Sequence, residues 1–333
     1  MDKILSISVA AYNVENFIKL NLDSFVNSDV RDYIEVLVTD DESKDKTTKI
    51  VSEYENKYPG VIKLIRQKNA GPGSTVNSGI KNASGKYFRM VDGDDWVDTE
   101  NLKEYIEFLK NNEVDMIVTN YTTVDNETGE KKLYRIENKE TNKVLDFEKE
   151  CKDIDLQMHN VTFKTEILKD NNITLDNGFY TDVEYLLLPF EFIKTIAFLD
   201  LNIYMYRISL ATQSVSLPSK QKNIEMHDLV LKRLVKYYQR LKEENKTGEN
   251  IQSFILNRIS DMAESQFYIL LSFKPEKKYK IELKNFIKYI KNNCKEIYNT
   301  RYSKMKMIKG LEYSSFMLYN YISNVYRKRN NLM

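Results

Sequence analysis

The sequence contains few of the residues on which small or specialised folds depend. Among its 333 residues there are only 2 cysteines, 5 prolines and 10 glycines. Cys151 and Cys294 are too far apart in sequence to suggest a disulfide framework or a zinc site, and a reducing compartment is expected. The shortage of glycine and proline, beside abundant Lys, Asn and Ile, is typical of AT-biased coding and excludes no function.

The chain also lacks an excess of one charge and a long apolar run. Its 50 Lys and Arg residues are matched by 49 Asp and Glu residues, which leaves a net charge of +1. Nucleic acid is therefore not an expected partner. The most apolar later segment, 186–206, is interrupted by charged residues and is too polar to cross a bilayer. Residues 1–10 are expected to form a strand and not a signal peptide. We expect a cytoplasmic protein, with contact to the inner face of the membrane left open.

What the sequence does contain is a short acidic stretch, Asp92 to Asp95, directly after the strand-like run 87–91. Carboxylates crowded together repel one another, so a fold tolerates them mainly where a cation shares the charge. Oxygen ligands of this kind suit Mg²⁺ or Mn²⁺, which complete their shells with water and substrate phosphates. The alternative is an acidic turn in which Asp98 caps the next helix.

The first hundred residues alternate between two periodicities. Segments of helical spacing are separated by four apolar runs of strand length, at 4–10, 34–38, 61–65 and 87–91. This alternation predicts an α/β fold with a mostly parallel central sheet and helices on both faces. Asn13 and Ser43 are expected to cap the first two helices.

Acidic residues follow two of the predicted strands, at Asp40-Asp41 and at 92–95. Because ligands bind outside the carboxyl ends of parallel strands, we expect one binding site at this edge. A Rossmann dinucleotide site is excluded, since no Gly-rich turn follows the first strand and Gly71 and Gly73 come after the third. No Walker A pattern is present either, so metal and basic side chains must hold any phosphate.

The N-terminal part of the chain resembles the family 2 glycosyltransferases of the GT-A fold. The matching motifs occur in the family's order: Tyr12-Asn13, Asp40-Asp41-x-Ser43, Asn69-x-Gly71, Asn77-x-Gly79, Ala83-x-Gly85-x-Tyr87 and Asp92-Gly93-Asp94-Asp95-Trp96. They cover roughly the first half of the chain, and they are specific together although each alone is weak. Many members carry Ala-Arg before the Asn-x-Gly motif, where this chain has Thr75-Val76. An arginine contact to the nucleotide is therefore missing or supplied elsewhere.

The resemblance implies a metal-dependent, inverting transfer of a hexosyl or N-acetylhexosaminyl group. The donor would be a UDP-sugar, and the acceptor a hydroxyl of a glycan or a lipid-linked molecule, in the synthesis of bacterial surface polysaccharide or glycoconjugate. By motif match, Asp40 and Asp41 would hold the base, with Asp41 at the uracil imide, and Asp92 would contact the ribose. The full set of implied donor contacts is Ala11, Tyr12, Asn13, Asp40, Asp41, Asn69, Asn77, Asp92, Gly93, Asp94, Arg207 and Ser214.

The same resemblance suggests a metal site and a catalytic base. Mn²⁺ or Mg²⁺ would bind at Asp94 and Asp95. His159 is a further candidate ligand, for which a hydrogen-bonded structural histidine is the alternative. An inverting displacement needs a general base opposite the leaving group, and Asp182 stands at the matching place, with Glu184 as the alternative. Asp182 would also suit the cap of the helix that follows it.

Two further segments carry expectations of their own. The segments around Arg207 and Ser214 resemble the family's tyrosine-arginine strand and the serine loop that closes over the donor phosphates. For Arg207, the alternative is a surface arginine. After Pro218 the spacing of apolar residues predicts helices at 227–241, 251–273 and 281–290. We therefore expect a glycosyltransferase domain over 1–217 and a small helical domain over 218–333.

The last stretch, 301–333, combines basic residues with an aromatic-rich helical pattern. Such a helix suits an anionic membrane surface. Packing on its own domain or on a second subunit, as in a homo-oligomer, is the alternative.

The sequence leaves two alternative functions. A sugar-phosphate nucleotidyltransferase shares the sheet and the metal chemistry but needs a Gly-rich basic loop after the first strand, which is absent. A catalytically inactive scaffold that binds nucleotide or membrane is the second rival, and the intact Asp92, Asp94 and Asp182 argue against it.

Overall fold

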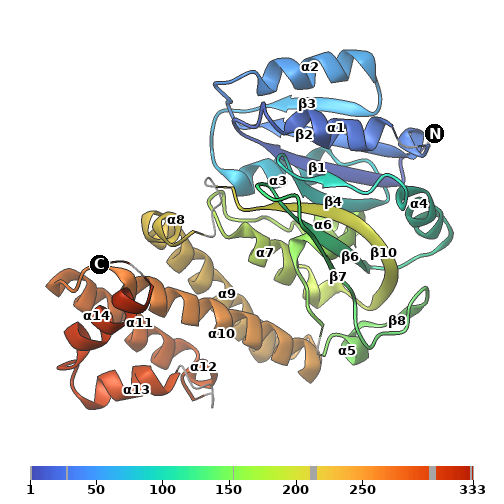
Figure 1. Cartoon of the computed structure of the whole chain (residues 1–333). Coiled ribbons are helices and arrows are strands. Elements are labelled where there is room, and N and C mark those ends of the chain that lie inside the picture. Colours follow the sequence, from blue (N-terminus) through green and yellow to red (C-terminus); the bar gives the residue numbers. More distant parts are fainter. Residues whose placement is uncertain are drawn as a thin grey trace. The chain divides into compact units, whose positions relative to one another are not determined.

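The computed structural model describes residues 2–27, 29–152, 154–210, 216–299, 305–330 and 332, with the side chains of 305–308 excepted. It divides into two compact units, Met1–Thr212 and Gln213–Met333. The first carries a sheet with its helices, and the described part of the second is helical (Figure 1). The division falls a little before the boundary expected after 217, and the exact domain limits stay a prediction.

The first unit is built on a ten-stranded mixed sheet in the order β3-β2-β1-β4-β9-β6-β10-β5, with β7 paired to β6 and β8 to β10. The strands are β1 Leu5–Ala11, β2 Ile34–Asp40, β3 Ile62–Arg66, β4 Tyr87–Asp92, β5 Trp96–Val97, β6 Met116–Asp125, β7 Lys131–Tyr134, β8 Val144–Asp146, β9 Val161–Lys164 and β10 Thr195–Ile208. The four predicted strands are confirmed, and they pair in parallel with one another; β6 and β10 form a further parallel pair.

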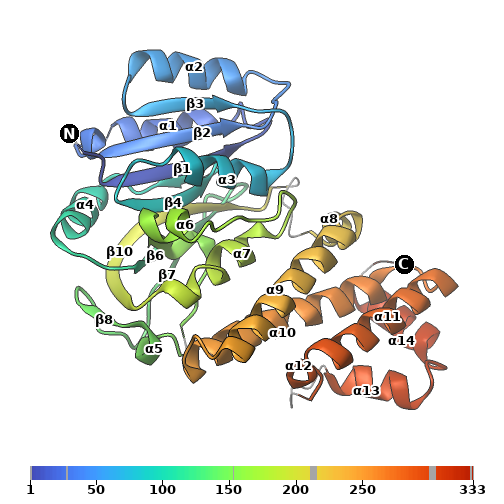
Figure 2. The same cartoon turned by 180° about the vertical axis from the view of Figure 1, so that it is seen from behind.

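Helices cover both faces of this sheet, as the alternating pattern predicts. Figures 1 and 2 show α1 on one face and α3 on the other. The covering makes β1 and β2 almost wholly buried, as parallel strands usually are. The helices and helical turns of this unit are α1 Ile18–Val26, η1 Arg31–Tyr33, α2 Thr47–Lys57, α3 Pro72–Asn82, α4 Leu102–Asn111, α5 Phe147–Glu150, η2 Met158–Asn160, α6 Thr165–Asp170, α7 Thr181–Leu187 and η3 Phe190–Phe192.

The expected helix caps at Asn13 and Ser43 are wrong. Helix α1 begins only at Ile18 and α2 at Thr47, and neither has a side-chain cap. Asn13 takes a left-handed conformation, with φ of 54°. Its backbone N–H donates to Ser43 Oγ at 3.0 Å, and its Oδ1 accepts from the Lys44 N–H at 2.8 Å. The two polar side chains therefore tie the loops after β1 and β2 to each other.

The second unit is a set of helices around an apolar core. They are α8 Leu217–Lys222, α9 Ile224–Glu244, α10 Glu249–Ser272, α11 Lys277–Asn293, α12 Lys295–Asn299, α13 Met305–Tyr313 and α14 Tyr319–Arg329. The three helices predicted from the sequence are confirmed as parts of α9, α10 and α11, except that α10 ends one residue before Phe273. Among the described residues, no helix combines the length and the apolar character needed to cross a bilayer.

Candidate active site

The carboxyl ends of the central parallel strands meet at one edge of the sheet. In the register of β1, Ala11 lies opposite Asp40 of β2, and Ala10 lies opposite Asp92 of β4. Asp182 comes from far along the chain, in the first turn of α7. Its negative charge is among the causes that raise the pKa of Asp92, so these two carboxyl groups lie near each other. The structure thus brings together the acidic strand end and the predicted base.

The acids after β2 are buried and bind the next loop. Asp40 accepts hydrogen bonds from Thr48 Oγ1 at 2.8 Å and from the Ser43 N–H at 3.3 Å. Asp41 accepts from Gln67 Nε2 at 2.8 Å, and from the backbone N–H groups of residues 70 and 71 at 3.0 and 2.9 Å. Because its carboxylate anchors the 69–71 loop, Asp41 has a structural role in addition to the predicted contact to the uracil of the nucleotide.

Two other predicted donor contacts also hold the loops around the site. Asn69 Nδ2 donates to the carbonyl oxygen of Asp41 at 3.0 Å. Asn77, in α3, donates to the carbonyl of Leu175 at 3.0 Å and accepts from its N–H at 2.9 Å. Asn77 therefore fastens the segment that leads to Asp182.

The loop at the start of α3 lies directly against that same segment. The Gly73 N–H donates to the carbonyl of Asn177 at 3.1 Å. A Cβ on Gly73 would lie 1.7 Å from the carbonyl oxygen of Asp176 and 2.6 Å from Cγ2 of Thr181. Only glycine fits there, so the position of α7 depends on this contact.

The acidic turn after β4 is held from two sides. Asp95 is 1% exposed; its Oδ2 accepts from the Tyr204 hydroxyl at 2.6 Å, and its Oδ1 from the Arg207 N–H at 2.7 Å. Asn21 in α1 donates to the carbonyl oxygens of Asp92 and Asp95 at 3.1 and 2.9 Å. Sequence reasoning missed Asn21 and Tyr204. The signal for Asn21 was an amide on the otherwise apolar face of its helix.

The electrostatics of this turn favour a bound cation. Burial, and then the charges of Asp94 and Asp182, raise the pKa of Asp92 to about 7. Burial also raises the pKa of Asp95 well above its ordinary value, and raises that of Asp94, for which the Arg207 cation acts in the opposite direction. Carboxylates placed this way ionise readily only when positive charge joins them.

One group of side chains has the spacing of a metal site. Single ligand atoms of Asp92, Asp95 and His159 all lie within 4.8 Å of one another. Burial, with a smaller effect of the Arg89 cation, lowers the pKa of His159 to about 3. The imidazole is thus neutral, which is the form that binds metals, and its Nδ1 has no hydrogen-bond partner among the described residues. Asp94, which the sequence predicted as a ligand, is not in this group.

Arg207 lies at the acidic turn. Its Nε donates to the carbonyl of Asp94 at 2.8 Å, and its guanidinium lies over the rings of Phe17 and Trp96, 4.9 and 4.8 Å from their centroids. These contacts hold a half-buried cation beside the carboxylates. Ser214, predicted on the following loop, lies outside the described residues.

The remaining predicted donor contacts come from the turns beside the acids. Ala11 is buried at the end of β1, whereas the Tyr12 side chain is 51% exposed. Gly93 packs closely on β1, because a Cβ there would lie 2.7 Å from the carbonyl oxygen of Ala10. Each of these residues lies at the predicted edge of the sheet.

Comparison with known proteins gives this arrangement a context. Residues 6–171 match the sequence model of Glycosyl transferase family 2. A poly(ribitol-phosphate) beta-glucosyltransferase of Bacillus spizizenii is 34% identical over 173 residues, which are 51% of this chain and 26% of that protein. The uncharacterized glycosyltransferase EpsJ of Bacillus subtilis is 28% identical over 218 residues, 62% of each protein. The chain thus spans less than two thirds of the length of these relatives.

The fold extends further than the sequence similarity. The crystal structure of S. aureus TarS 1–349 in complex with UDP-GlcNAc superimposes with a TM-score of 0.67 at 21% identity, covering 98% of this chain and 92% of that one. This likeness confirms the predicted fold class, a GT-A α/β unit followed by helices.

Proposed function

The chain belongs to glycosyl transferase family 2 through residues 6–171, and from this premise we propose that it is a metal-dependent, inverting glycosyltransferase that uses a UDP-sugar. The observation that carries the proposal is the convergence of Asp92, Asp95 and His159, with the charge of Asp182 close enough to act on Asp92. Such a site can bind a diphosphate through a cation and deprotonate an acceptor on the other side.

The three grouped side chains, Asp92, Asp95 and His159, suit Mn²⁺ or Mg²⁺, since carboxylates and a neutral imidazole are ligands that these ions accept. A divalent cation held there would stabilise the negative charge that develops on the departing diphosphate. Arg207 would add a second, fixed positive charge beside it. Asp94 stays a predicted ligand, because its carboxylate acts electrostatically on Asp92 from the same turn.

Asp182 is favoured as the general base over Glu184. Glu184 is fully buried, and its Oε2 accepts from the Asp176 N–H at 2.5 Å, which commits it to holding the turn before α7. Asp182 lies in the first turn of α7, and its negative charge helps to raise the pKa of Asp92. It would take the proton of the incoming hydroxyl while the sugar bond to the diphosphate breaks.

The relatives support the choice of substrates. S. aureus TarS has been crystallised with UDP-GlcNAc, and the Bacillus spizizenii relative is named for transfer of glucose to poly(ribitol-phosphate). We infer a UDP-hexose or UDP-N-acetylhexosamine as donor. As acceptor we infer a hydroxyl of a surface glycan, a related polymer or a lipid-linked precursor.

The proposal is tested by donor turnover. Release of UDP from a panel of UDP-sugars should require Mn²⁺ or Mg²⁺ and stop in EDTA, and calorimetry should detect UDP binding in the presence of the metal. Turnover without metal would contradict the metal dependence. No turnover with any donor, together with no UDP binding, would favour the inactive scaffold.

Replacing Gly73 tests whether the loop at the start of α3 positions Asp182, the proposed general base. Gly73→Ala should reduce turnover at least about tenfold, because the new Cβ must displace the 176–181 backbone and with it Asp182. The same substitution should lower the free energy of unfolding in urea by about 1–3 kcal/mol. Gly310→Ala is the matched control, since a Cβ there meets nothing within 4 Å. Full activity of Gly73→Ala would show that Asp182 does not depend on this contact.

Membrane contact through 301–333 stays a proposal, and an exposed apolar patch supports it. Tyr313, Met317 and Tyr321 are 95%, 79% and 69% exposed, and exposed basic residues Lys328 and Arg329 end the same region. Aromatic side chains beside basic ones suit an anionic lipid surface.

A flotation experiment tests this contact with the full chain. The protein should float with phosphatidylglycerol vesicles and not with phosphatidylcholine vesicles, and the combined change of Tyr313, Met317 and Tyr321 to alanine should abolish flotation. Leu20→Ala with Val144→Ala is a control at exposed apolar positions of the first unit. Equal flotation of both variants would contradict the proposal. A mass that rises with protein concentration in ultracentrifugation, and is lost in the triple variant, would instead indicate a second subunit on the patch.

A further inference from the structure

A row of four aromatic rings leads away from the acidic cluster. Its members are Tyr206, His159, Tyr121 and Tyr134, whose neighbouring ring centroids lie 4.0, 5.6 and 4.8 Å apart. At the near end, Tyr206 stacks on His159, whose ring belongs to the group of possible metal ligands with Asp92 and Asp95. At the far end, Tyr121 and Tyr134 stack almost in parallel, with an interplanar angle of 3°. The row connects the proposed reaction centre with another part of the molecule.

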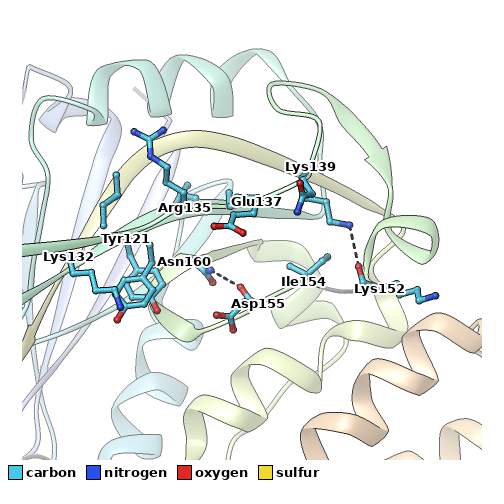
Figure 3. A pocket seen from close by; sticks show the side chains of 14 residues that line it. Tyr121, Lys132, Arg135, Glu137, Lys139, Lys152, Ile154, Asp155 and Asn160 are labelled. Atoms are coloured by element: carbon cyan, nitrogen blue, oxygen red, sulfur yellow. Dashed lines mark hydrogen bonds between the residues drawn. The ribbon is translucent and has the colours of Figure 1, made fainter.

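The far end of the row forms one wall of a pocket of about 710 Å³ (Figure 3). Strands β6 and β7 and the chain that follows β7 supply one side, and the segment around Asp155 and Asn160 supplies the other. A volume in this range suits a small organic ligand or part of a larger one, since such pockets hold about 300–1,000 Å³. In the sheet order, β6 and β2 lie on opposite sides of β4, so this pocket lies on the other side of β4 from Asp40 and Asp41, which are predicted to hold the nucleotide base.

The lining carries four cations and two carboxylates, and two of the cations are paired with acids outside the lining. Arg135 pairs with Asp200 at 3.2 Å, and Lys139 with a glutamate at 3.1 Å. Figure 3 shows the Arg135 side chain pointing away from the other labelled residues. Among the described residues, the remaining charged groups of the lining are two lysines and the carboxylates of Glu137 and Asp155, and none of these four has an ion-pair partner. Once the two ion pairs are counted, two lysines remain with two carboxylates, so little net positive charge is left to attract a polyanion.

The chemistry of the lining instead suits a neutral, hydroxyl-rich group. Carboxylates such as Glu137 and Asp155 accept strong hydrogen bonds from hydroxyls, and Lys132 can donate to them. The stacked tyrosines offer a flat apolar face with polar ends, which matches the C–H face and the hydroxyls of a sugar ring or an alditol.

We propose that this pocket and the aromatic row form a binding subsite for a neutral, polyhydroxylated unit of the acceptor, a sugar or an alditol, at a distance from its reacting hydroxyl. The proposal rests on the proposed function, because it gives the acceptor a pocket on the β6 side of β4, across from Asp40 and Asp41, which are predicted to hold the base of the donor. It deepens that function by naming the chemical class of the acceptor unit that binds at a distance from the reacting hydroxyl.

Ligand-observed NMR with defined probes tests the subsite. Saturation-transfer signals should appear for maltotriose and ribitol and be much weaker for ribitol 5-phosphate, because the added negative charge meets two unpaired carboxylates. Tyr134→Ala and Glu137→Gln should each weaken binding of the neutral probes about tenfold. Glu127→Gln, an exposed position in the turn of the same hairpin, is the matched control and should leave binding unchanged. UDP affinity measured by calorimetry should stay unaltered in all three variants, which also shows that they are folded.

Several outcomes would overturn the proposal. These are no signal for either neutral probe with the wild type, equal or stronger binding of ribitol 5-phosphate, and unchanged binding of the neutral probes in both pocket variants. Failure of the proposed function shows itself differently, as the loss of metal-dependent UDP-sugar turnover and UDP binding in the wild type. Because the NMR experiment needs neither donor nor turnover, the two failures can be told apart.

Discussion

Asp182→Asn should lower sugar transfer at least about a hundredfold while changing the affinity for UDP by less than about twofold. Asparagine has nearly the same size as aspartate but cannot accept the proton of the incoming hydroxyl. The surrounding backbone does not depend on this carboxylate alone, since Asn77 and Gly73 hold the preceding segment. The loss should therefore appear in turnover, measured with saturating UDP-sugar, and not in calorimetric binding of UDP.

Glu184→Gln provides the comparison for this result. Glu184 accepts a hydrogen bond from the Asp176 N–H, so its replacement should mainly reduce stability in urea and leave a smaller defect in turnover. The reverse pattern, with a normal rate for Asp182→Asn and an inactive but stable Glu184→Gln, would transfer the role of base to Glu184. Weak UDP binding with normal turnover in Asp182→Asn would also contradict the assignment.

Neutralising Asp92 should have opposite effects with and without metal. Asp92→Asn should weaken Mn²⁺-dependent binding of UDP at least about a hundredfold, because one of the grouped ligands is lost. Without metal the same variant should be at least as stable as the wild type, since the repulsion with Asp94 and Asp182 is removed. Calorimetry of UDP with Mn²⁺ and urea unfolding in EDTA measure the two effects. Asp32→Asn, at an exposed acid away from the site, is the control.

The pH dependence of the metal-free protein follows from the same group. Because the folded pKa of Asp92 is about 7, above its ordinary 3.8, its contribution to stability is complete below about 3.8 and is lost as the pH rises toward 7. Asp92→Asn should remove this decline, and Mn²⁺ should reduce it in the wild type. If Asp94→Asn abolishes metal binding while Asp92→Asn retains it, the ion is bound through Asp94, as predicted from the sequence, and not through Asp92 of the group seen in the structure.

Strands β1, β2, β3 and β4 could be predicted because the sequence patterns that indicate them are local. Each of the four strands is an apolar run of the right length, and the acids at 40–41 and 92–95 follow those runs directly. Asp182 was found only through the family resemblance, since a lone aspartate before an apolar helix is also a common cap. Asp92 and Asp182 are 90 positions apart in the sequence, so no local pattern indicates that they lie near each other.

The rest of the sheet, which includes antiparallel pairs and the parallel pair of β6 and β10, could not be predicted because it depends on long-range pairing. Strand β9 lies between β4 and β6 and runs opposite to both, an arrangement that no short pattern in 161–164 indicates. The caps at Asn13 and Ser43 were wrong for a related reason. Each residue has the chemistry of a cap, but the neighbouring loop offered a better-placed partner. Tyr121 and Tyr134 likewise become a stacked pair only when β7 folds back on β6.

Strand β7 lies off the main path of the sheet and, among the described strands, pairs with β6 alone, whereas β6 itself is a central strand between β9 and β10. Exchange of β7 and the turn before it for those of another enzyme would thus break few strand pairings elsewhere. Under the proposed function, a protein built this way could change the acceptor unit that it binds through substitutions in this peripheral strand, while the residues at the carboxyl ends of β1, β2 and β4 stay unchanged.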